Sequence, residues 1–422
     1  MIFLGVVTLV PTLIHYYLWR RLVRNTTRPG RARRIGTWVV VGLAVMVLAT
    51  FIGSRVLPHG AAVVFAWTGY VWLALMFYLV VTLAVLELPA LVARIVLRRR
   101  TSRAAVVAPE QVPVGALAGA GSDPPTALAG PGGDPPPAEP DAEAGAVGES
   151  RRLFLARTVA VTAGVVSVGL VGSGIPVAMG APRIKRVPIT LARLPRTADG
   201  LKIAVVADIH VGEINGAAHM RRVVDMINDL EADVIAVVGD TVDGSVADLS
   251  AVTAPLRELR ARFGSYIVTG NHEYYSGYEQ WLVEFDRLGL RVLLNERDEL
   301  PVGVDLAGVN DLQGRQFNHG PDVPKALAGR DPAKVAIMLA HQPAQAAEAA
   351  RHGVDLQLSG HTHGGQVVPF NLVVRASGQP VVSGLGEVDG MPVYVTNGAG
   401  FWGPPVRVGT RPDISLVELR AP

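Results

Sequence analysis

Hydrophobic positions follow two different patterns along the chain. In the N-terminal part they form long, almost wholly apolar runs, which are Ile2 to Trp19, Ile35 to Val56, Ala61 to Leu86 and Thr158 to Gly180. From Ile184 onward the apolar runs are short, β-branched and bounded by Gly, Asp or Asn. Runs of about 20 apolar residues are long enough to cross a bilayer, whereas the short runs are typical of buried strands. We therefore expect a membrane region followed by a soluble domain.

Residues 1–100 are predicted to form a membrane region with three transmembrane helices. The run from Ile2 is the shortest of the three and contains Pro11 and His15. Arginines cluster after the first and third runs, at Arg20, Arg21, Arg24, Arg28, Arg31, Arg33 and Arg34 and at Arg94, Arg98, Arg99, Arg100 and Arg103. Because positive loops stay in the cytoplasm, the N-terminus and the turn at Pro58 to Gly60 are expected to face outward.

Residues 101–149 are dominated by Ala, Gly, Pro and acidic side chains. Such a composition buries too little apolar surface to offset its ordering entropy. We expect a disordered linker on the cytoplasmic side.

Residues 150–182 combine a basic start with a fourth apolar run. The sequence Ser-Arg-Arg-Leu-Phe-Leu-Ala-Arg from Ser150 to Arg157 resembles a twin-arginine export signal. A plain transmembrane helix with a positive cytoplasmic flank is the alternative. Either version carries residues 183–422 to the outer side, and cleavage after Ala181 is left open.

The composition supports this division. Half of the residues are hydrophobic, 18% are charged and the mean hydropathy is +0.33, which indicates membrane segments. The chain has no Cys, so disulfides, thiolate metal sites and cysteine nucleophiles are excluded. The net charge is only +3. The chain lacks a basic stripe with interleaved aromatics, which would indicate nucleic-acid binding.

The soluble domain is predicted to be an α/β (α+β) fold with sheet packed on sheet inside flanking helices. The expected strands are Ile203 to Ala207, Val234 to Val238, Tyr266 to Thr269, Arg291 to Leu294, Val335 to Leu339 and Val354 to Leu358. The expected helices are Ala217 to Leu230, Leu249 to Arg262, Tyr278 to Leu288 and Gln342 to Arg351. Functional groups are expected in loops at strand ends.

Two Asp-containing motifs follow the first two strands. Alternation along an extended chain would point Asp208 and His210 to the same side, although a lone Asp-x-His is more often a turn or a surface pair. In Gly239 to Asp243, the carboxylate of Asp240 could bridge two cations. An Asp that caps the following helix is the alternative.

Three further motifs follow later strands. Gly270-Asn271-His272-Glu273 offers an amide oxygen and a neighbouring imidazole. His341 follows the strand that ends at Leu339. The heptad from Gly360 to Gln366 places His361 and His363 between glycines, which permit an irregular turn that aims both rings into a cleft.

A hydrophobic core does not require a potential ligand at the end of five strands. In this order, the motifs resemble those of the calcineurin-like metallophosphoesterase family over about Ile203 to Phe401. The resemblance implies a β-sandwich flanked by helices. Within the family the chain is similar to bacterial membrane-associated phosphodiesterases, some with twin-arginine signals, through Gly364-Gly365-Gln366 and the segment Asn397 to Arg407.

The resemblance also implies roles for the motif residues. One metal ion would be held by Asp208, His210 and His363, a second by Asn271, His341 and His361, and both by Asp240. His272 would be the general acid or transition-state stabiliser, and Asp243 would orient it. The ligand set suits Mn, Fe or Zn better than Ca or Mg, and a hydroxide activated by the two metals would attack phosphorus.

We therefore expect a membrane-anchored metal-dependent phosphoric ester hydrolase with an extracytoplasmic catalytic domain. Its substrate would be a phosphodiester at the cell envelope, lipid-linked or derived from the cell wall, and the twin-arginine export machinery would be a partner. Two alternatives stay open: a catalytically silent membrane sensor or scaffold, and a nucleotide-pyrophosphate or protein phosphatase. Trp402 and Arg407 would either help to close the substrate cleft or be a packed Trp and a solvated Arg.

Overall fold

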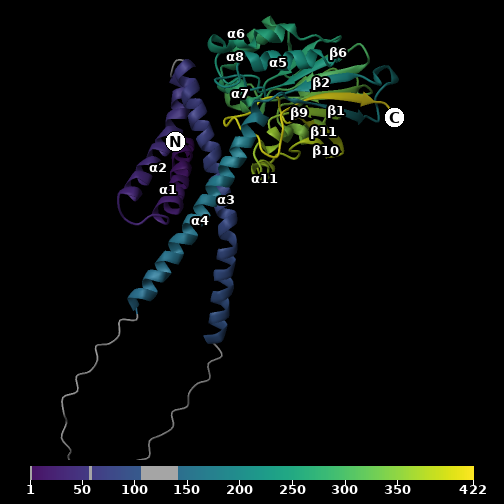
Figure 1. Cartoon of the computed structure of the whole chain (residues 1–422). Coiled ribbons are helices and arrows are strands. Elements are labelled where there is room, and N and C mark those ends of the chain that lie inside the picture. Colours follow the sequence, from purple (N-terminus) through teal and green to yellow (C-terminus); the bar gives the residue numbers. More distant parts are fainter. Residues whose placement is uncertain (1, 57–58, 106–140) are drawn as a thin grey trace, which may run out of the picture. The chain divides into compact units, whose positions relative to one another are not determined.

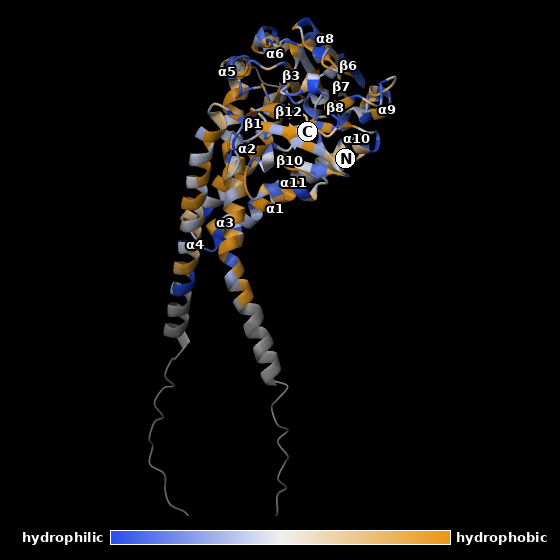
Figure 2. Ribbon diagram, turned by 90° about the vertical axis from the view of Figure 1, so that its right-hand side faces the viewer, coloured by the Kyte–Doolittle hydropathy of each residue, from blue (hydrophilic) through white to orange (hydrophobic). Residues whose placement is uncertain are grey.

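The computed structural model describes residues 2–56, 59–105 and 141–422 (Figure 1). The described residues up to Met179 are mainly helical: α1 is Ile2–Leu18, followed by a π-helical turn at Trp19–Arg24, and the long helices are α2 (Arg31–Val56), α3 (His59–Ala105) and α4 (Asp141–Met179). Three stretches of the described residues are long and apolar enough to cross a membrane, namely Arg31–Gly53, Gly60–Pro89 and Ser150–Met179 (Figure 2). Helix α1 has 17 residues and is not among them, so its crossing stays a prediction.

The predicted linker falls mostly on residues 106–140, which lie outside the described residues. On either side of these residues, α3 continues to Ala105 and α4 begins at Asp141. Ala, Arg and Glu are good helix formers, and at both ends they extend an apolar helix without a break.

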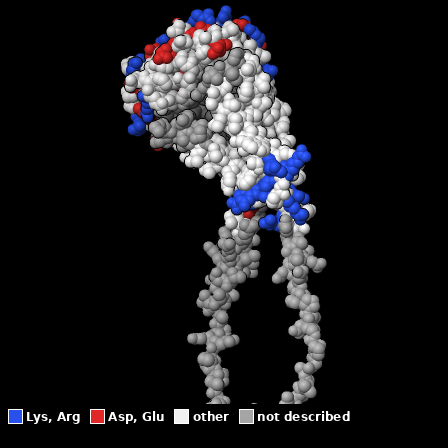
Figure 3. All heavy atoms as spheres, turned by 90° about the vertical axis from the view of Figure 1, so that its left-hand side faces the viewer, with Lys and Arg blue, Asp and Glu red and all other residues white. Residues whose placement is uncertain are grey.

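The chain divides into two compact units, and the division cuts through α2, α3 and α4. The first unit joins Met1–Val41 to Leu79–Val166. Within it, Arg157 Nε donates to the carbonyl of Thr26 at 3.0 Å, so that the arginines of the fourth run lie beside those that follow the first run. Lys and Arg side chains gather there into a patch (Figure 3). One end of this unit is therefore strongly basic.

The second unit joins Gly42–Tyr78 to Ser167–Pro422 and contains a sandwich of two six-stranded sheets. The first sheet has the order β1 (Arg183–Thr190), β12 (Asp413–Arg420), β2 (Lys202–Val206), β3 (Val234–Val238), β4 (Ser265–Val268), β5 (Arg291–Val292). The second has the order β10 (Gly384–Val388), β11 (Met391–Val395), β9 (Leu356–Ser359), β8 (Val335–Leu339), β7 (Val304–Gly308), β6 (Glu296–Leu300). Strands β2 to β5 are mutually parallel, as are β7, β8, β9 and β11.

Side-chain alternation along the strands produces the layers. On β2, Ile203 and Val205 face the core between the sheets, where they meet residues such as Ile337 of β8. Ala204 and Val206 face the opposite way, toward helices that include α5 (Ala217–Asn228) and α8 (Tyr278–Arg287). Short helices α9 (Val323–Ala326) and α10 (Ala346–Arg351) cover the second sheet. The predicted layering, with sheet on sheet inside helices, is confirmed.

The predicted elements differ from the observed ones at their ends and in the number of strands, because β1, β6, β7, β10, β11 and β12 were not predicted. The helix expected to run to Arg262 is α6 (Val246–Thr253), followed by a 3₁₀ turn at Ala254–Glu258. Pro255 causes the break, because it has no amide hydrogen for the helical ladder. Polar strands such as β6, with the sequence Glu-Arg-Asp-Glu-Leu, have no hydrophobic alternation and were not predicted.

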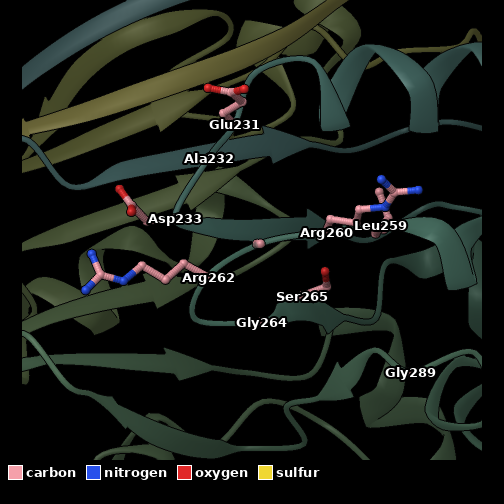
Figure 4. Close-up of a pocket in the computed structure, with 10 residues that line it drawn as sticks. Glu231, Ala232, Asp233, Leu259, Arg260, Arg262, Gly264, Ser265 and Gly289 are labelled. Atoms are coloured by element: carbon pink, nitrogen blue, oxygen red, sulfur yellow. The ribbon is translucent and has the colours of Figure 1, made fainter.

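Parallel pairing brings the functional loops to one edge of the sandwich. The carboxyl ends of parallel strands in a sheet point the same way, so the residues after β2, β3 and β4 meet one another, as do those after β8 and β9. A surface pocket lined by residues such as Asp233, Arg260 and Ser265 is drawn in Figure 4. Asp233 precedes β3 and Ser265 begins β4, so this pocket lies at the opposite edge from the predicted ligands.

Candidate metal centre

The structure brings the predicted carboxylate and imidazole ligands together. They form three overlapping groups whose potential ligand atoms lie within 4.8 Å of one another: Asp208, His210 and His363; His210, Asp240 and His272; and Asp240, His341 and His361. The first and third groups match the two predicted metal sites, and Asp240 joins the third group to the second. Asn271, the predicted amide ligand, begins α7 (Asn271–Tyr275) directly after β4.

The backbone at these residues is left-handed rather than extended. Five predicted ligands have positive φ angles: Asp208 (53°), His210 (49°), Asp240 (52°), His361 (72°) and His363 (51°). The extended-chain reason that we gave for Asp208 and His210 is therefore wrong, although the two side chains do converge. Each such residue costs about 1–3 kcal/mol and persists only where its surroundings hold it. Strain concentrated on the ligands indicates a functional site.

Gly239 lets the loops after β3 and β4 approach each other closely. Its φ is 78°, and a Cβ placed on it would lie 2.5 Å from the amide nitrogen of Gly270 and 2.8 Å from Nδ1 of His341. No other residue type could occupy this position without moving the two loops apart.

Asp243 orients two imidazoles. Its Oδ1 accepts hydrogen bonds from Nδ1 of His272 at 2.6 Å and Nδ1 of His210 at 2.9 Å. A carboxylate only accepts, so both rings carry a proton on Nδ1 and turn Nε2 away from Asp243. The contact with His272 was predicted, and the structure adds His210.

Burial and charge shift the protonation of these groups in different directions. Burial lowers the pKa of His272, but the charges of Asp240 and Asp243 outweigh it and raise the pKa to about 9. Burial raises the pKa of Asp208 to about 6, and burial together with the nearby His341 lowers the pKa of His361 to about 3. Closely packed titratable groups with shifts of opposite sign are typical of catalytic sites.

The donor set fits a bound cation. Asn271 Oδ1 is fully buried and has no hydrogen-bond partner among the described residues. His341 Nε2 is also buried, and it lies 3.1 Å from Asp240 Oδ2 without the geometry of a hydrogen bond. A buried acceptor without a donor is costly, and a divalent cation would satisfy both atoms. Imidazole nitrogen together with carboxylate and amide oxygen suits Mn, Fe or Zn.

Glu273 ties the loops of the site together, a role that we did not predict. Its side chain is fully buried; Oε2 accepts the amide hydrogens of Gly270 and Asp240 at 2.6 and 2.9 Å, and Oε1 accepts that of Thr241 at 2.7 Å. Burial, with the charge of Asp240, raises the pKa of Glu273 to about 7. The Gly-Asn-His-Glu motif contained this residue. Its role could not be predicted, because its partners are main-chain amides, which every residue except Pro has.

Arg407 connects the loop of His363 to the segment 397–400. Its guanidinium donates to the carbonyls of His363 at 3.0 Å, Asn397 at 2.7 Å and Gly400 at 2.6 Å, and only 1% of the residue is exposed. A solvated Arg407 was one of the two alternatives open from the sequence, and the structure excludes it. Trp402 is half-exposed rather than packed. Its carbonyl accepts a hydrogen bond from Gln366 Nε2, and its amide donates one to Gln366 Oε1.

The profile of the family described as calcineurin-like phosphoesterase matches residues 201–365. An uncharacterized metallophosphoesterase of Aquifex aeolicus is 32% identical over 241 residues, which cover 56% of this chain and 92% of the relative. The chain belongs to the calcineurin-like phosphoesterase family. Membership implies a metal-dependent phosphoester hydrolase. The two-sheet sandwich and the grouped Asp and His side chains agree with it.

Other relatives match over a similar region, and one of them is named as a transmembrane protein. A transmembrane protein with a metallophosphoesterase domain from Danio rerio is 36% identical over 291 residues, covering 66% of this chain and 65% of the relative. An uncharacterized metallophosphoesterase of Helicobacter pylori is 39% identical over 244 residues, covering 57% and 65%. The chain thus spans just under two thirds of the length of these two relatives.

The three hydrogen bonds of Glu273 predict a sensitive position. In Glu273→Gln, the amide group must turn one donor toward backbone N–H groups, so at least one buried donor loses its acceptor. We expect a loss of about 1–3 kcal/mol in the free energy of unfolding, measured as a lower thermal midpoint of the purified full chain. Glu279→Gln on the surface of α8 is the control, and equal midpoints for the two variants would contradict the assigned role.

Proposed function

We propose that this protein is a membrane-anchored phosphodiesterase with a dinuclear metal centre that acts at the cell envelope. The observation that carries the proposal is the position of Asp240. Its carboxylate forms one group with His341 and His361 and another with His210, which also belongs to the group of Asp208 and His363. A carboxylate placed between two sets of ligands is what a two-metal centre requires.

The ligands divide between two ions. Asp208, His210 and His363 would hold the first, Asn271, His341 and His361 would hold the second, and Asp240 would contribute to both. Two divalent cations, with Mn, Fe or Zn as candidates, supply the charge that acidifies a water molecule and attracts phosphoryl oxygens. The protein fixes the ligand positions through the strained loops and through the hydrogen bonds of Glu273 and Arg407.

His272 donates the proton to the leaving oxygen. Its Nδ1 is held by Asp243, so Nε2 is left to face the substrate. The ring also makes an edge contact with the exposed Tyr275 at 5.5 Å between centroids, so His272 lies on the solvent-facing side of the ligand cluster. This position suits a proton donor that does not bind metal.

The envelope location rests on the charge pattern and the fourth helix. The arginine clusters place the basic ends of the helices in the cytoplasm, and α4 then carries the catalytic domain outward. The twin-arginine-like segment Ser150–Arg157 lies in α4 and offers an export route. A phosphodiester that is lipid-linked or derived from the cell wall is the substrate class available at that surface.

Metal dependence tests the chemistry. We expect the full-length protein in detergent to hydrolyse bis-p-nitrophenyl phosphate after loading with Mn, and to lose this activity on chelation. Asp240→Asn, which removes the shared charge, should lower kcat by on the order of a thousandfold, while the surface control Asp225→Asn retains it. Turnover that survives chelation, or full activity in Asp240→Asn, would overturn the mechanism.

The role of His272 predicts a dependence on the leaving group. p-Nitrophenolate leaves without a proton, whereas an alkoxide does not. His272→Gln should therefore lose roughly 100-fold or more in kcat with an alkyl phosphodiester and much less with bis-p-nitrophenyl phosphate. Bound metal, measured by mass spectrometry, should match the wild type and the exposed control His352→Gln. An equal loss with both substrates would remove proton donation from the proposal.

Topology tests the location independently of the chemistry. A phosphatase reporter joined after Pro422 should be active outside the cytoplasm, and a fluorescent reporter that folds only in the cytoplasm should stay dark. The opposite result would contradict the envelope assignment and leave the metal chemistry standing.

A further inference from the structure

The loops beside the metal centre contact α3 directly. The hydroxyl of Tyr78 donates to the carbonyl of Val368 at 3.1 Å, and the ring of Phe77 meets that of Phe370 edge-on with centroids 6.2 Å apart. A small buried cluster joins α3 and α4 to the loop that carries Arg407; its members are Ala74, Tyr78, Val171 and Val406. All of these residues belong to the second compact unit.

This part of α3 lies inside a stretch able to cross a membrane. Phe77 and Tyr78 fall within the span Gly60–Pro89. A segment of the catalytic domain that packs on them lies beside residues that lipid would surround. The surface of the catalytic domain around Val368 and Phe370 is therefore continuous with the predicted membrane span.

The neighbouring surface is apolar and exposed in the part of the chain that the structure describes. Val368 is 41% exposed, Leu372 65%, Val373 55% and Trp402 51%. Leu372 and Val373 lie on the short helix α11 (Phe370–Ala376), and the ten residues from Val367 to Ala376 contain one basic residue, Arg375, and no acidic one. Exposed aliphatic and Trp side chains with an adjacent Arg match the boundary between lipid headgroups and acyl chains.

We propose that Val368, Leu372, Val373 and Trp402 form a membrane-docking surface that inserts into the lipid bilayer beside α3. The lipid bilayer covers this surface, because the surface is continuous with the predicted membrane span of α3. The docking surface also borders the active site, because Gln366, three residues after His363, bonds the main chain of Trp402. On the basis of the proposed function, the substrate is a phosphodiester with a lipid tail that reaches the metals without leaving the membrane.

The absence of cysteine permits a direct test. A single cysteine at Leu372→Cys in the full chain is labelled with an environment-sensitive fluorophore, and the protein is reconstituted in equal parts of dioleoyl phosphatidylcholine and dioleoyl phosphatidylglycerol. Brominated phospholipid should quench this label several-fold more than it quenches a label at Val283→Cys, an equally exposed apolar position on α8. Aqueous iodide should show the reverse order.

Two results of the labelling experiment would overturn the proposal. Strong quenching of the Leu372→Cys label by iodide, equal to that at Val283→Cys, would place the surface in water. Protection from both quenchers would mean that protein covers it, either another helix of this chain or a second copy.

Activity supplies a second, independent measurement. In the same vesicles, Leu372→Asp combined with Val373→Asp should lower hydrolysis of p-nitrophenyl hexadecyl phosphate by roughly tenfold, because two carboxylates oppose insertion. The rate with water-soluble bis-p-nitrophenyl phosphate should not change, and Val283→Asp should change neither rate. An equal effect on both substrates would overturn the proposal. If the wild type hydrolysed neither substrate, the proposed function would fall while the labelling would still decide the docking.

Discussion

The burial of many ionisable side chains at one edge of the sandwich is the constraint on which this structure depends. Asp208, Asp240, His341 and His363 are all nearly inaccessible to solvent. An uncompensated buried carboxylate costs several kcal/mol, a large part of the total stability of a domain. Two such carboxylates within one cluster require that the surrounding protein, and cations when they bind, supply positive potential.

Backbone amides supply much of that potential within the protein. Both carboxylate oxygens of Asp208 accept the amide hydrogen of His361 at 3.0 Å, and Asp240 Oδ1 accepts that of His272 at 2.8 Å. The left-handed backbone at the ligand residues turns their loops tightly at the strand ends, so that donors and ligand atoms share a small volume. The strain and the hydrogen bonds are therefore parts of one arrangement: the turns that cost energy also hold the carboxylates in place.

The sequence predicts the ligands and most of the strands that carry them, but not the side chains that hold the loops together. β-Branched runs such as Val234 to Val238 identify buried strands because a strand covered on both faces is apolar throughout, and the ligands were predicted because each follows such a run. Glu273 and Arg407 were present in the quoted motifs, yet their roles were not predicted, since their partners are main-chain groups that every residue possesses. Strands β1 and β12 were missed for a related reason: they pair Arg183–Thr190 with Asp413–Arg420, and only the tertiary fold brings these distant segments together.

The connection between α4 and the metal centre is short enough to restrict how a substrate can approach. The amide of Arg407 donates to the carbonyl of Gly174 in α4 at 3.1 Å, and a Cβ on Gly174 would lie 2.6 Å from Val406 Cγ1. The guanidinium of the same Arg407 holds the carbonyl of His363. A helix of the predicted membrane region and a predicted metal ligand are thus joined through one residue rather than through a flexible linker. Because packing fixes the ligand cluster relative to this part of α4, discrimination among the substrates of the proposed activity would depend on the direction from which the phosphate arrives as well as on contacts with the cluster.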